Sequence, residues 1–313
     1  MNLRARDPKR YRIKGSCALF GKTKQAFYKY DEELHLACAA ERSFAVEYAR
    51  EIRQQDPGMG MDKIWHMYKA KFSCERNVLG RDAFCTLLAE EGMKIRMKRR
   101  RAKTTDSSHG LPVYPNLTKD FIPDAPDQLW VSDITYIEIM LPGNRYIFCY
   151  LSLILDAYSK EIVGWSVGNT LKTIYPLEAL RMALKRIEGK QTRLIHHSDR
   201  GIQYASSEYT ALLNRHGITI SMTECGDPKD NAQAERINNT MKNELLRGKT
   251  FCSITEVADN VDSAVEFYDN SRPHMSLDMH TPAEASRMRG PIRRRWNSFR
   301  ENAINMAKEG KNE

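Results

Sequence analysis

The sequence predicts an α/β protein: a mixed five-stranded sheet with flanking helices, preceded by a small all-helical N-terminal region. Three observations predict this fold. Residues 1–93 carry apolar residues at helical spacing, residues 128–169 contain three β-rich runs joined by short turns, and helices then alternate with short strands as far as residue 250. Hairpin-linked strands pair antiparallel, whereas a strand reached through a helix runs parallel to an earlier one, so the sheet is expected to be mixed.

The composition indicates a globular protein with an anionic partner. The chain has 313 residues, of which 41% are hydrophobic and 28% charged, and its net charge is +9. A basic excess suits a partner rich in phosphate. No apolar stretch of about 18 residues occurs, so neither a signal peptide nor a membrane span is expected. The 7 cysteines form no CxxC pair, which argues against a disulfide scaffold or a cysteine zinc site and fits a cytoplasmic protein.

Residues 1–93 are predicted to form a helix-turn-helix-like DNA-binding region, with a plain helical bundle as the alternative. Two short segments flank Gly21 within 16–30, and further helices are expected at 40–55, 60–72 and 80–93. Residues 94–127 are predicted to be a basic linker, in which seven of the ten residues 94–103 are Lys or Arg. We expect this run to contact DNA phosphates, through Lys98, Arg99, Arg100 and Arg101.

An α/β core is predicted at 128–250, followed by a helical, basic C-terminal extension at 251–313. In this part, β-rich apolar runs bounded by turn residues predict strands, and apolar residues at helical spacing predict helices. The expected strands are 128–139, 145–156, 161–169, 192–198 and 218–222, and the expected helices are 175–188, 206–217 and 231–248.

Two aspartates lie where apolar strands would not ordinarily carry them. Asp133 sits between Val131 and Ile134 in the first strand, and Asp199 follows the fourth strand. A carboxylate in an apolar strand is costly unless it is paired or bound to a metal. If the fourth strand lies beside the first, Asp133 and Asp199 face each other, and a divalent cation would offset their repulsion.

The helix at 231–248 supplies a third carboxylate. Asp230 is the expected N-cap, with Gln233 completing a capping box, so Asp230 is read as structural. Glu235 and Lys242 are seven residues apart and fall on one face of a regular helix. That face is either solvated surface or part of a site. Three hard oxygen ligands without cysteine favour Mg²⁺ or Mn²⁺, and two such ions support phosphoryl transfer.

Three blocks, "WVSDITYI", "HHSDRGIQYAS" and "GDPKDNAQAERINNTMKNEL", resemble the catalytic blocks of bacterial insertion-sequence transposases with a retroviral-integrase-like core. The signature of that family is Asp, Asp and Glu, with 35 residues between the last two. Here 35 residues separate Asp199 from Glu235, and Lys242 matches the family's basic position seven residues later. The chain looks like the larger product of a two-reading-frame element.

The resemblance implies a ribonuclease H-like fold and a DDE site that cleaves DNA at the element's ends and joins the freed 3′-OH to target DNA. Asp133, Asp199 and Glu235 would then be catalytic and bind two Mg²⁺ or Mn²⁺ ions. Lys242, Asn231 and Arg200 would contact DNA, although Arg200 stands where the family carries a small or amide residue. The implied partners are double-stranded DNA, further copies of the chain, and an upstream-frame helix-turn-helix protein or fusion, in the bacterial cytoplasm at the nucleoid.

Several alternatives remain at this stage. A ribonuclease H-like nuclease or resolvase would use the same carboxylates to cut without joining, and a catalytically idle DNA-binding protein would use none of them. His197 either orients a ligand or ends its strand. The segment Arg272-Pro273-His274 either contacts DNA or braces the core.

Overall fold

The computed structural model describes residues 13–25, 32–74, 78–95, 110–190, 193–224 and 231–295, with 302, 304 and 306. The basic residues Lys98, Arg99, Arg100 and Arg101 lie outside the described residues, as does Asp230. Within the described part of the chain, no helix is both long and apolar enough to cross a membrane.

The sheet is ribonuclease H-like, with five strands in the order β3-β2-β1-β4-β5. β1 pairs antiparallel with β2, β2 pairs antiparallel with β3, and β4 is parallel to both β1 and β5. The predicted mixed sheet is therefore confirmed. Its strands are β1 (Leu129–Leu141), β2 (Arg145–Asp156), β3 (Ile162–Gly168), β4 (Ile195–Ser198) and β5 (Thr219–Met222).

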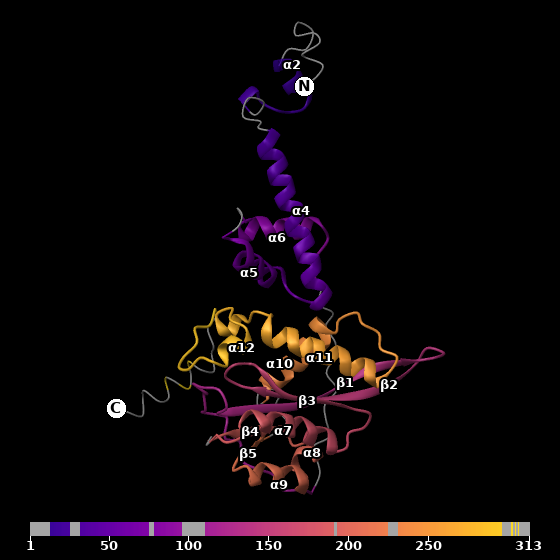
Figure 1. Cartoon of the computed structure of the whole chain (residues 1–313), viewed down its shortest axis with the longest axis vertical. Coiled ribbons are helices and arrows are strands. Elements are labelled where there is room, and N and C mark those ends of the chain that lie inside the picture. The colour runs from indigo at the N-terminus through magenta and orange to yellow at the C-terminus, as the bar shows by residue number, and fades with distance from the viewer. Residues whose placement is uncertain are drawn as a thin grey trace.

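Helices cover both faces of this sheet (Figure 1). One layer packs around Trp130 and the other around Val131, because successive side chains of β1 point to opposite faces. The first layer holds α7 (Ile174–Arg186), α8 (Ile202–Ala205) and α9 (Ser207–Arg215). The second holds α10 (Ala232–Thr240), the π-helical turn η1 (Met241–Leu245) and α11 (Ile254–Asn270), followed by η2 (Met275–Leu277) and α12 (Pro282–Ala285).

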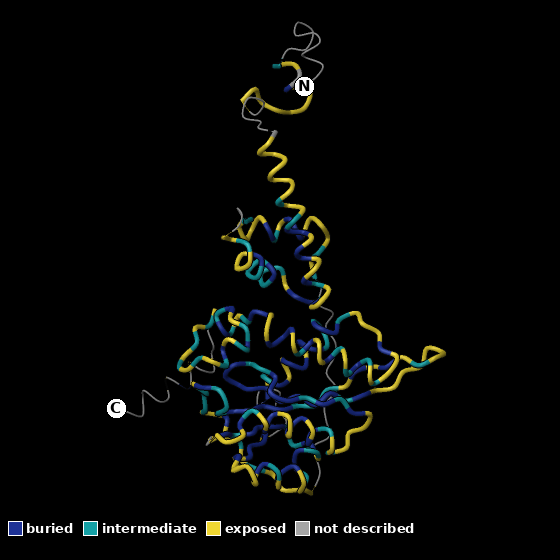
Figure 2. Tube along the Cα trace, viewed as in Figure 1, coloured by how far each residue is buried: buried dark blue, intermediate teal, exposed yellow. Residues whose placement is uncertain are grey.

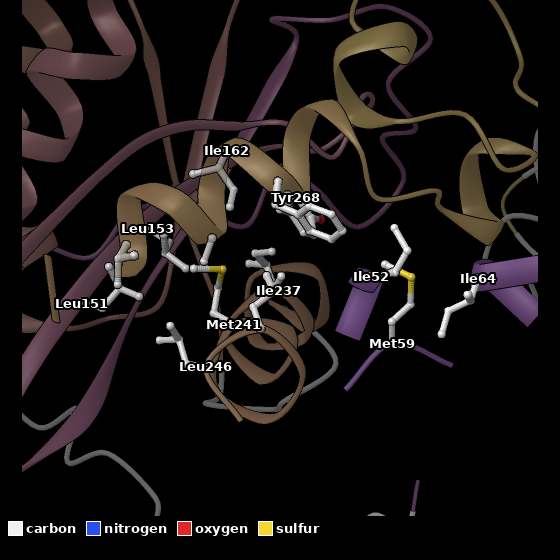
Figure 3. Packing of buried hydrophobic residues seen from close by; sticks show 14 of the residues in the cluster. Ile52, Met59, Ile64, Leu151, Leu153, Ile162, Ile237, Met241, Leu246 and Tyr268 are labelled. Carbon is white, nitrogen blue, oxygen red and sulfur yellow. The ribbon is translucent and has the colours of Figure 1, made fainter. Parts of the chain in front are cut away.

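The described N-terminal helices are α2 (Ile13–Leu19), α4 (Glu32–Gln55), α5 (Met61–Phe72) and α6 (Arg81–Glu90). Of these, α4, α5 and α6 contribute residues to the hydrophobic cluster of the second layer. Figure 3 shows Ile52, Met59 and Ile64 near Tyr268 and Ile237, and all five belong to one hydrophobic cluster. Much of the sheet is buried, whereas the tip of the β1–β2 hairpin and much of α4 are exposed (Figure 2). The N-terminal helices thus share their core with the sheet.

Two local features differ from the sequence predictions. Asn231, instead of Asp230, is the N-cap of α10, and it makes no side-chain cap hydrogen bond, so the predicted capping box was wrong. The side chain of Gln233 instead accepts a hydrogen bond from Lys160. The single helix predicted over 231–248 was also wrong, because the wider π-turn begins at Met241, where the amide of Leu246 bonds the Met241 carbonyl.

The β5 edge of the sheet is covered by the segment that precedes the core. The amide of Met222 donates to the Pro115 carbonyl over 3.4 Å, and the Ser221 hydroxyl accepts from the Leu117 amide over 2.9 Å. This segment therefore occupies hydrogen-bonding groups that an edge strand would otherwise present to solvent.

Candidate active site

The parallel pairing of β1 and β4 sets Asp133 and Asp199 side by side. Ser132 is the register partner of Ser198, and each aspartate is the next residue in the chain, Asp133 within β1 and Asp199 directly after β4. Burial and the neighbouring Asp199 raise the pKa of Asp133 to about 7. The proximity predicted from the sequence is therefore confirmed, and the two carboxylates repel one another in the folded protein.

Backbone amides hold both aspartates in place. Asp133 Oδ1 accepts from the Ile134 amide over 2.8 Å, and Asp199 Oδ1 accepts from the Gly201 amide over 3.0 Å. Arg200, between the second pair, donates from Nε to the Thr223 carbonyl over 2.6 Å. Its guanidinium therefore ties the loop after β4 to the segment after β5.

Helix α10 is fastened across the ends of these strands. Asn231 Nδ2 donates to the Ser132 carbonyl over 2.9 Å, and Asn238 Nδ2 donates to Asp133 Oδ2 over 2.8 Å. Asn231 is only 6% exposed. This burial makes Asn231 part of the frame of the site, where it positions α10 on β1.

Asn238 contacts Asp133, and the sequence did not assign it this role. It lies three residues after Glu235, on the same side of a regular helix, and this spacing was the available signal. Its amide donates to Asp133, which favours the charged carboxylate and opposes the effect of burial on that pKa.

Glu235 lies in the first turn of α10, where its side chain is exposed. Its charge adds to the rise in the pKa of Asp133, so the two carboxylates are within electrostatic range. Among the described residues, however, no three His, Cys, Asp or Glu side chains form a group that could hold a metal ion. The structure brings Asp133 and Asp199 together and leaves Glu235 nearby without closing a three-carboxylate cluster.

The two histidines of β4 are buried behind the site. His196 Nε2 lies 3.0 Å from both the Ser132 hydroxyl and the Tyr209 hydroxyl, and burial together with His197 lowers its pKa to about 3. His197 is fully buried, with Nδ1 2.8 Å from the Ser221 hydroxyl. Of the two roles considered for His197, the structural one fits, because its ring links β4 to β5.

Lys242 lies in the π-turn that follows α10. Its ammonium sits 3.7 Å from the centroid of the Tyr136 ring on β1. This contact keeps the charge beside the strand that carries Asp133. Lys242 also lines a cavity of about 390 Å³ together with Arg247 and Lys249.

The segment Arg272-Pro273-His274 braces the core. Arg272 is 2% exposed and forms ion pairs with Asp56 and with Glu244 of the π-turn, the former at 3.2 Å. His274 Nε2 lies 3.1 Å from the same guanidinium. Of the two roles considered for this segment, bracing matches the contacts, because Arg272 joins three parts of the chain in the interior.

The donor set suits a hard divalent cation. Asp133 and Asp199 offer oxygen ligands, and a bound cation would offset their repulsion. The amides of Ile134 and Gly201 and the side chain of Asn238 donate hydrogen bonds that orient the two carboxylates. The residues present therefore fit Mg²⁺ or Mn²⁺ and not a thiolate-bound metal.

Comparisons with known proteins identify the family of this chain. Two models described as integrase core domain match residues 123–228 and 216–282. The chain is 36% identical over 208 residues to an uncharacterized 31 kDa protein of insertion element IS600 from Shigella sonnei, covering 66% of this chain and 74% of that protein. It is 34% identical over 228 residues to the transposase for insertion sequence element IS629 from Shigella sonnei, covering 73% of each. The chain belongs to the insertion-sequence transposases.

A third relative of this transposase is InsF of insertion sequence IS3A from Escherichia coli strain K12. It is 33% identical over 189 residues, which cover 60% of this chain and 64% of InsF. Among solved structures, the catalytic core of HTLV-2 integrase in complex with magnesium aligns at 17% identity and a TM-score of 0.41, over 53% of this chain and 99% of that one. The family resemblance predicted from the three catalytic blocks is confirmed, and the transposase acts in DNA transposition.

Proposed function

We propose that this transposase cleaves DNA at the ends of its insertion sequence and joins the freed 3′-OH to target DNA at the site formed by Asp133, Asp199 and Glu235. The observation that supports the proposal is the pairing of β1 with β4, by which Asp133 and Asp199 lie near enough for the Asp199 charge to raise the pKa of Asp133. Like charges held together at that position favour divalent cations.

In this proposal Asp133 and Asp199 hold Mg²⁺ or Mn²⁺, and Glu235 completes the ligand set when α10 meets DNA. Two such ions supply charge stabilisation for the attacking and leaving oxygens of an in-line displacement. Asn238 orients the Asp133 carboxylate, and Asn231 keeps the start of α10 on β1. The exposed position of Glu235 is consistent with a ligand that moves in late.

Two displacements would occur at this one site. In the first, water attacks the phosphodiester at the element's end, an oxygen–phosphorus bond breaks, and the 3′ oxygen leaves as a hydroxyl. In the second, that hydroxyl attacks a target phosphodiester and forms a new bond to phosphorus, and a 3′ oxygen of the target leaves. In each displacement the attacking oxygen loses a proton and the leaving 3′ oxygen gains one, with solvent as the carrier, and the first step leaves a 5′-phosphate on the flanking DNA.

Lys242 would hold a phosphate near the scissile bond, and Arg200 would lie beside the same strand. Lys98, Arg99, Arg100 and Arg101 would contact duplex phosphates further away, and we propose that copies of the chain assemble on DNA. Basic side chains that contact phosphate supply affinity but little sequence preference.

Asp199→Asn tests the proposal. The variant should lose cleavage and joining of DNA that carries the element's ends, because one metal-binding oxygen is removed, while DNA affinity changes less than about threefold. Products are sequenced after incubation with Mg²⁺, and affinity is measured by gel shift. Glu208→Gln on α9, away from the site, is the matched control.

The products separate the proposal from its alternatives. Cleaved ends without joined molecules in the wild type would favour a nuclease or resolvase, and DNA binding without either product would indicate an idle protein. Full cleavage by Asp199→Asn would remove Asp199 from the catalytic set.

A further inference from the structure

We propose that a second cavity, on the other side of α10 from Asp133, binds a phosphate carried on a nucleotide-sized group. The cavity has a volume of about 450 Å³ and lies between α10, the segment after α11, the residues before β1, and α5. Volumes of this order are typical of small-molecule sites.

The cavity lies against a different side of α10 from Asp133, although Asn231 at the start of the helix lines the cavity as well. Gln233, Arg236 and Thr240 line the cavity, at spacings of three and four residues. Asn238, by contrast, contacts Asp133 on the sheet. The two sites therefore use different sides of the same helix and can be altered separately.

The lining is strongly basic. Among the described residues that line the cavity, Glu244 is the single carboxylate. The cations are Lys63, Lys119, Lys160, Arg236, Arg272 and Arg294. Such a concentration of positive charge in a concave site favours an anion, and phosphate is the anion that guanidinium and ammonium groups bind well.

Part of this lining is fixed before any ligand arrives. Arg272 is 2% exposed and is held by its ion pairs with Asp56 and Glu244. Lys160 Nζ donates to Gln233 Oε1 over 2.8 Å, which holds the ammonium against α10. A preorganised site loses less side-chain entropy when a ligand binds.

The positive charges also act on one another. Burial and the charge of Arg272 lower the pKa of Lys63 to about 8. Burial, together with Arg272, Lys63 and Lys160, lowers the pKa of His274 well below its ordinary value. A bound phosphate would reduce the repulsion among these positive charges, all of which lie at the same cavity.

The apolar part of the lining indicates what carries the phosphate. Met275 lines the cavity and is 40% exposed, whereas Leu129, Val131 and Leu155 in the same lining are buried. A bare anion would leave that surface unused, whereas a base and sugar would cover it. Two sources share this chemistry, a free nucleotide and a nucleotide at the end of DNA.

Calorimetric titration of the full chain with 5′-dAMP tests the site. EDTA is present throughout, so that divalent cations at Asp133 and Asp199 cannot recruit the phosphate. We expect saturable binding of 5′-dAMP and none of deoxyadenosine, which lacks the phosphate. Arg236→Gln and Lys160→Gln should each weaken binding about tenfold, since each removes a cation from the lining.

Lys185→Gln on α7 is the matched control, because it removes a cation from a different cavity, and it should bind 5′-dAMP as the wild type does. Two short duplexes then identify the source of the phosphate. If the duplex with a 5′-phosphate displaces 5′-dAMP and the same duplex with a 5′-OH does not, the source is a DNA end. If neither duplex displaces 5′-dAMP, the source is the free nucleotide.

Absence of 5′-dAMP binding, or equal binding by the wild type and by folded Arg236→Gln and Lys160→Gln variants, would overturn the proposal. The test is independent of catalysis. Asp199→Asn should bind 5′-dAMP normally whether or not it cleaves DNA, so failure of this site and failure of the proposed active site give different results.

Discussion

Asp133 illustrates how function conflicts with stability at a single residue. A buried carboxylate next to a second carboxylate is unfavourable when charged, and burial together with Asp199 accordingly raises the pKa of Asp133 from 3.8 to about 7. In the proposed function this cost is offset when the same two side chains bind a cation together. Asn238 reduces the cost by donating to the carboxylate.

Asp133→Asn should therefore stabilise the metal-free protein at high pH. Between pH 3.8 and about 7 the folded chain keeps a proton that the unfolded chain has released. Stability from this group thus falls as pH rises, by up to about 1.4 kcal/mol per pH unit. Thermal unfolding in EDTA should show the variant more stable than wild type at pH 8, with the difference shrinking toward pH 4.

The difference in stability between variant and wild type reports on Asp133 alone, because the other buried carboxylates titrate in both proteins. A stability difference that stays constant from pH 4 to pH 8 would contradict the raised pKa. Saturating Mg²⁺ should reduce the difference at pH 8, because a ligand that binds the folded state stabilises it.

Lys242→Ala should weaken binding to processed DNA ends and make that binding less sensitive to salt. Removing one phosphate contact lowers the slope of log K against log salt concentration by about 1. Arg215→Ala, on α9, is a control from the opposite face of the sheet. An unchanged slope would show that the Lys242 ammonium serves its contact with Tyr136 and not DNA.

The sequence was most informative about residues whose chemistry conflicts with their surroundings. Asp133 and Asp199 were predictable because polar residues in apolar strands need a reason. The roles of His197 and Arg272 were not predictable, because both depend on partners distant in the chain. Ser221 is 24 residues from His197, and Asp56 is 216 residues from Arg272.

At the scale of elements, strand patterns were clear and helix ends were not. The predicted strand at 145–156 coincides with β2, since it begins after a tight turn and ends at Asp156. The π-turn at Met241–Leu245 could not be predicted, because its sequence suits an ordinary helix and tertiary contacts select the wider turn. The expectation that Glu235 and Lys242 share one face of a regular helix therefore does not hold, because Lys242 lies in the π-turn.

Those tertiary contacts come from the loop between α4 and α5. The Gly58 amide donates to the Glu244 carbonyl over 3.1 Å, and Arg272 holds the Glu244 side chain. A Cβ on residue 58 would lie 2.3 Å from Glu244 Cα, so only glycine permits this approach. The loop therefore fixes the turn that follows the proposed catalytic helix.

Gly58→Ala should disturb this junction. The added methyl group must displace backbone, which typically costs 1–3 kcal/mol in a packed site. We expect a lower unfolding temperature and, if α10 is catalytic, slower cleavage with DNA affinity retained. Gly110→Ala is the control, since no atom lies within 4 Å of its Cβ position. Equal behaviour of the two variants would mean that the loop is not a support for α10.

At the scale of the whole molecule, the N-terminal helices and the sheet share one hydrophobic cluster. A division into a region 1–93, a linker 94–127, a core 128–250 and an extension 251–313 remains a proposal. Packing of Met59 and Ile64 into the cluster of Ile237 was not visible in the sequence, because amphipathic helices do not specify which surface they cover.

Replacing Lys98, Arg99, Arg100 and Arg101 by glutamine should weaken DNA binding regardless of sequence. If all four contact duplex phosphates, the slope of log K against log salt concentration falls by about 3.6. Filter binding between low and moderate salt measures it. Gln substitution of Lys172, Arg181, Lys185 and Lys190, four exposed cations on or beside α7, provides the comparison, and an equal loss there would assign the effect to net charge alone.

The cover over β5 bears on how the catalytic part can be isolated. Pro115 and Leu117 occupy hydrogen-bonding positions beside Met222 and Ser221. A fragment that starts at residue 128 would contain every proposed catalytic residue and yet leave this edge open to pair with a second molecule. Such a fragment should aggregate in solution. A fragment that starts near residue 110 retains the segment that covers β5 and should aggregate less.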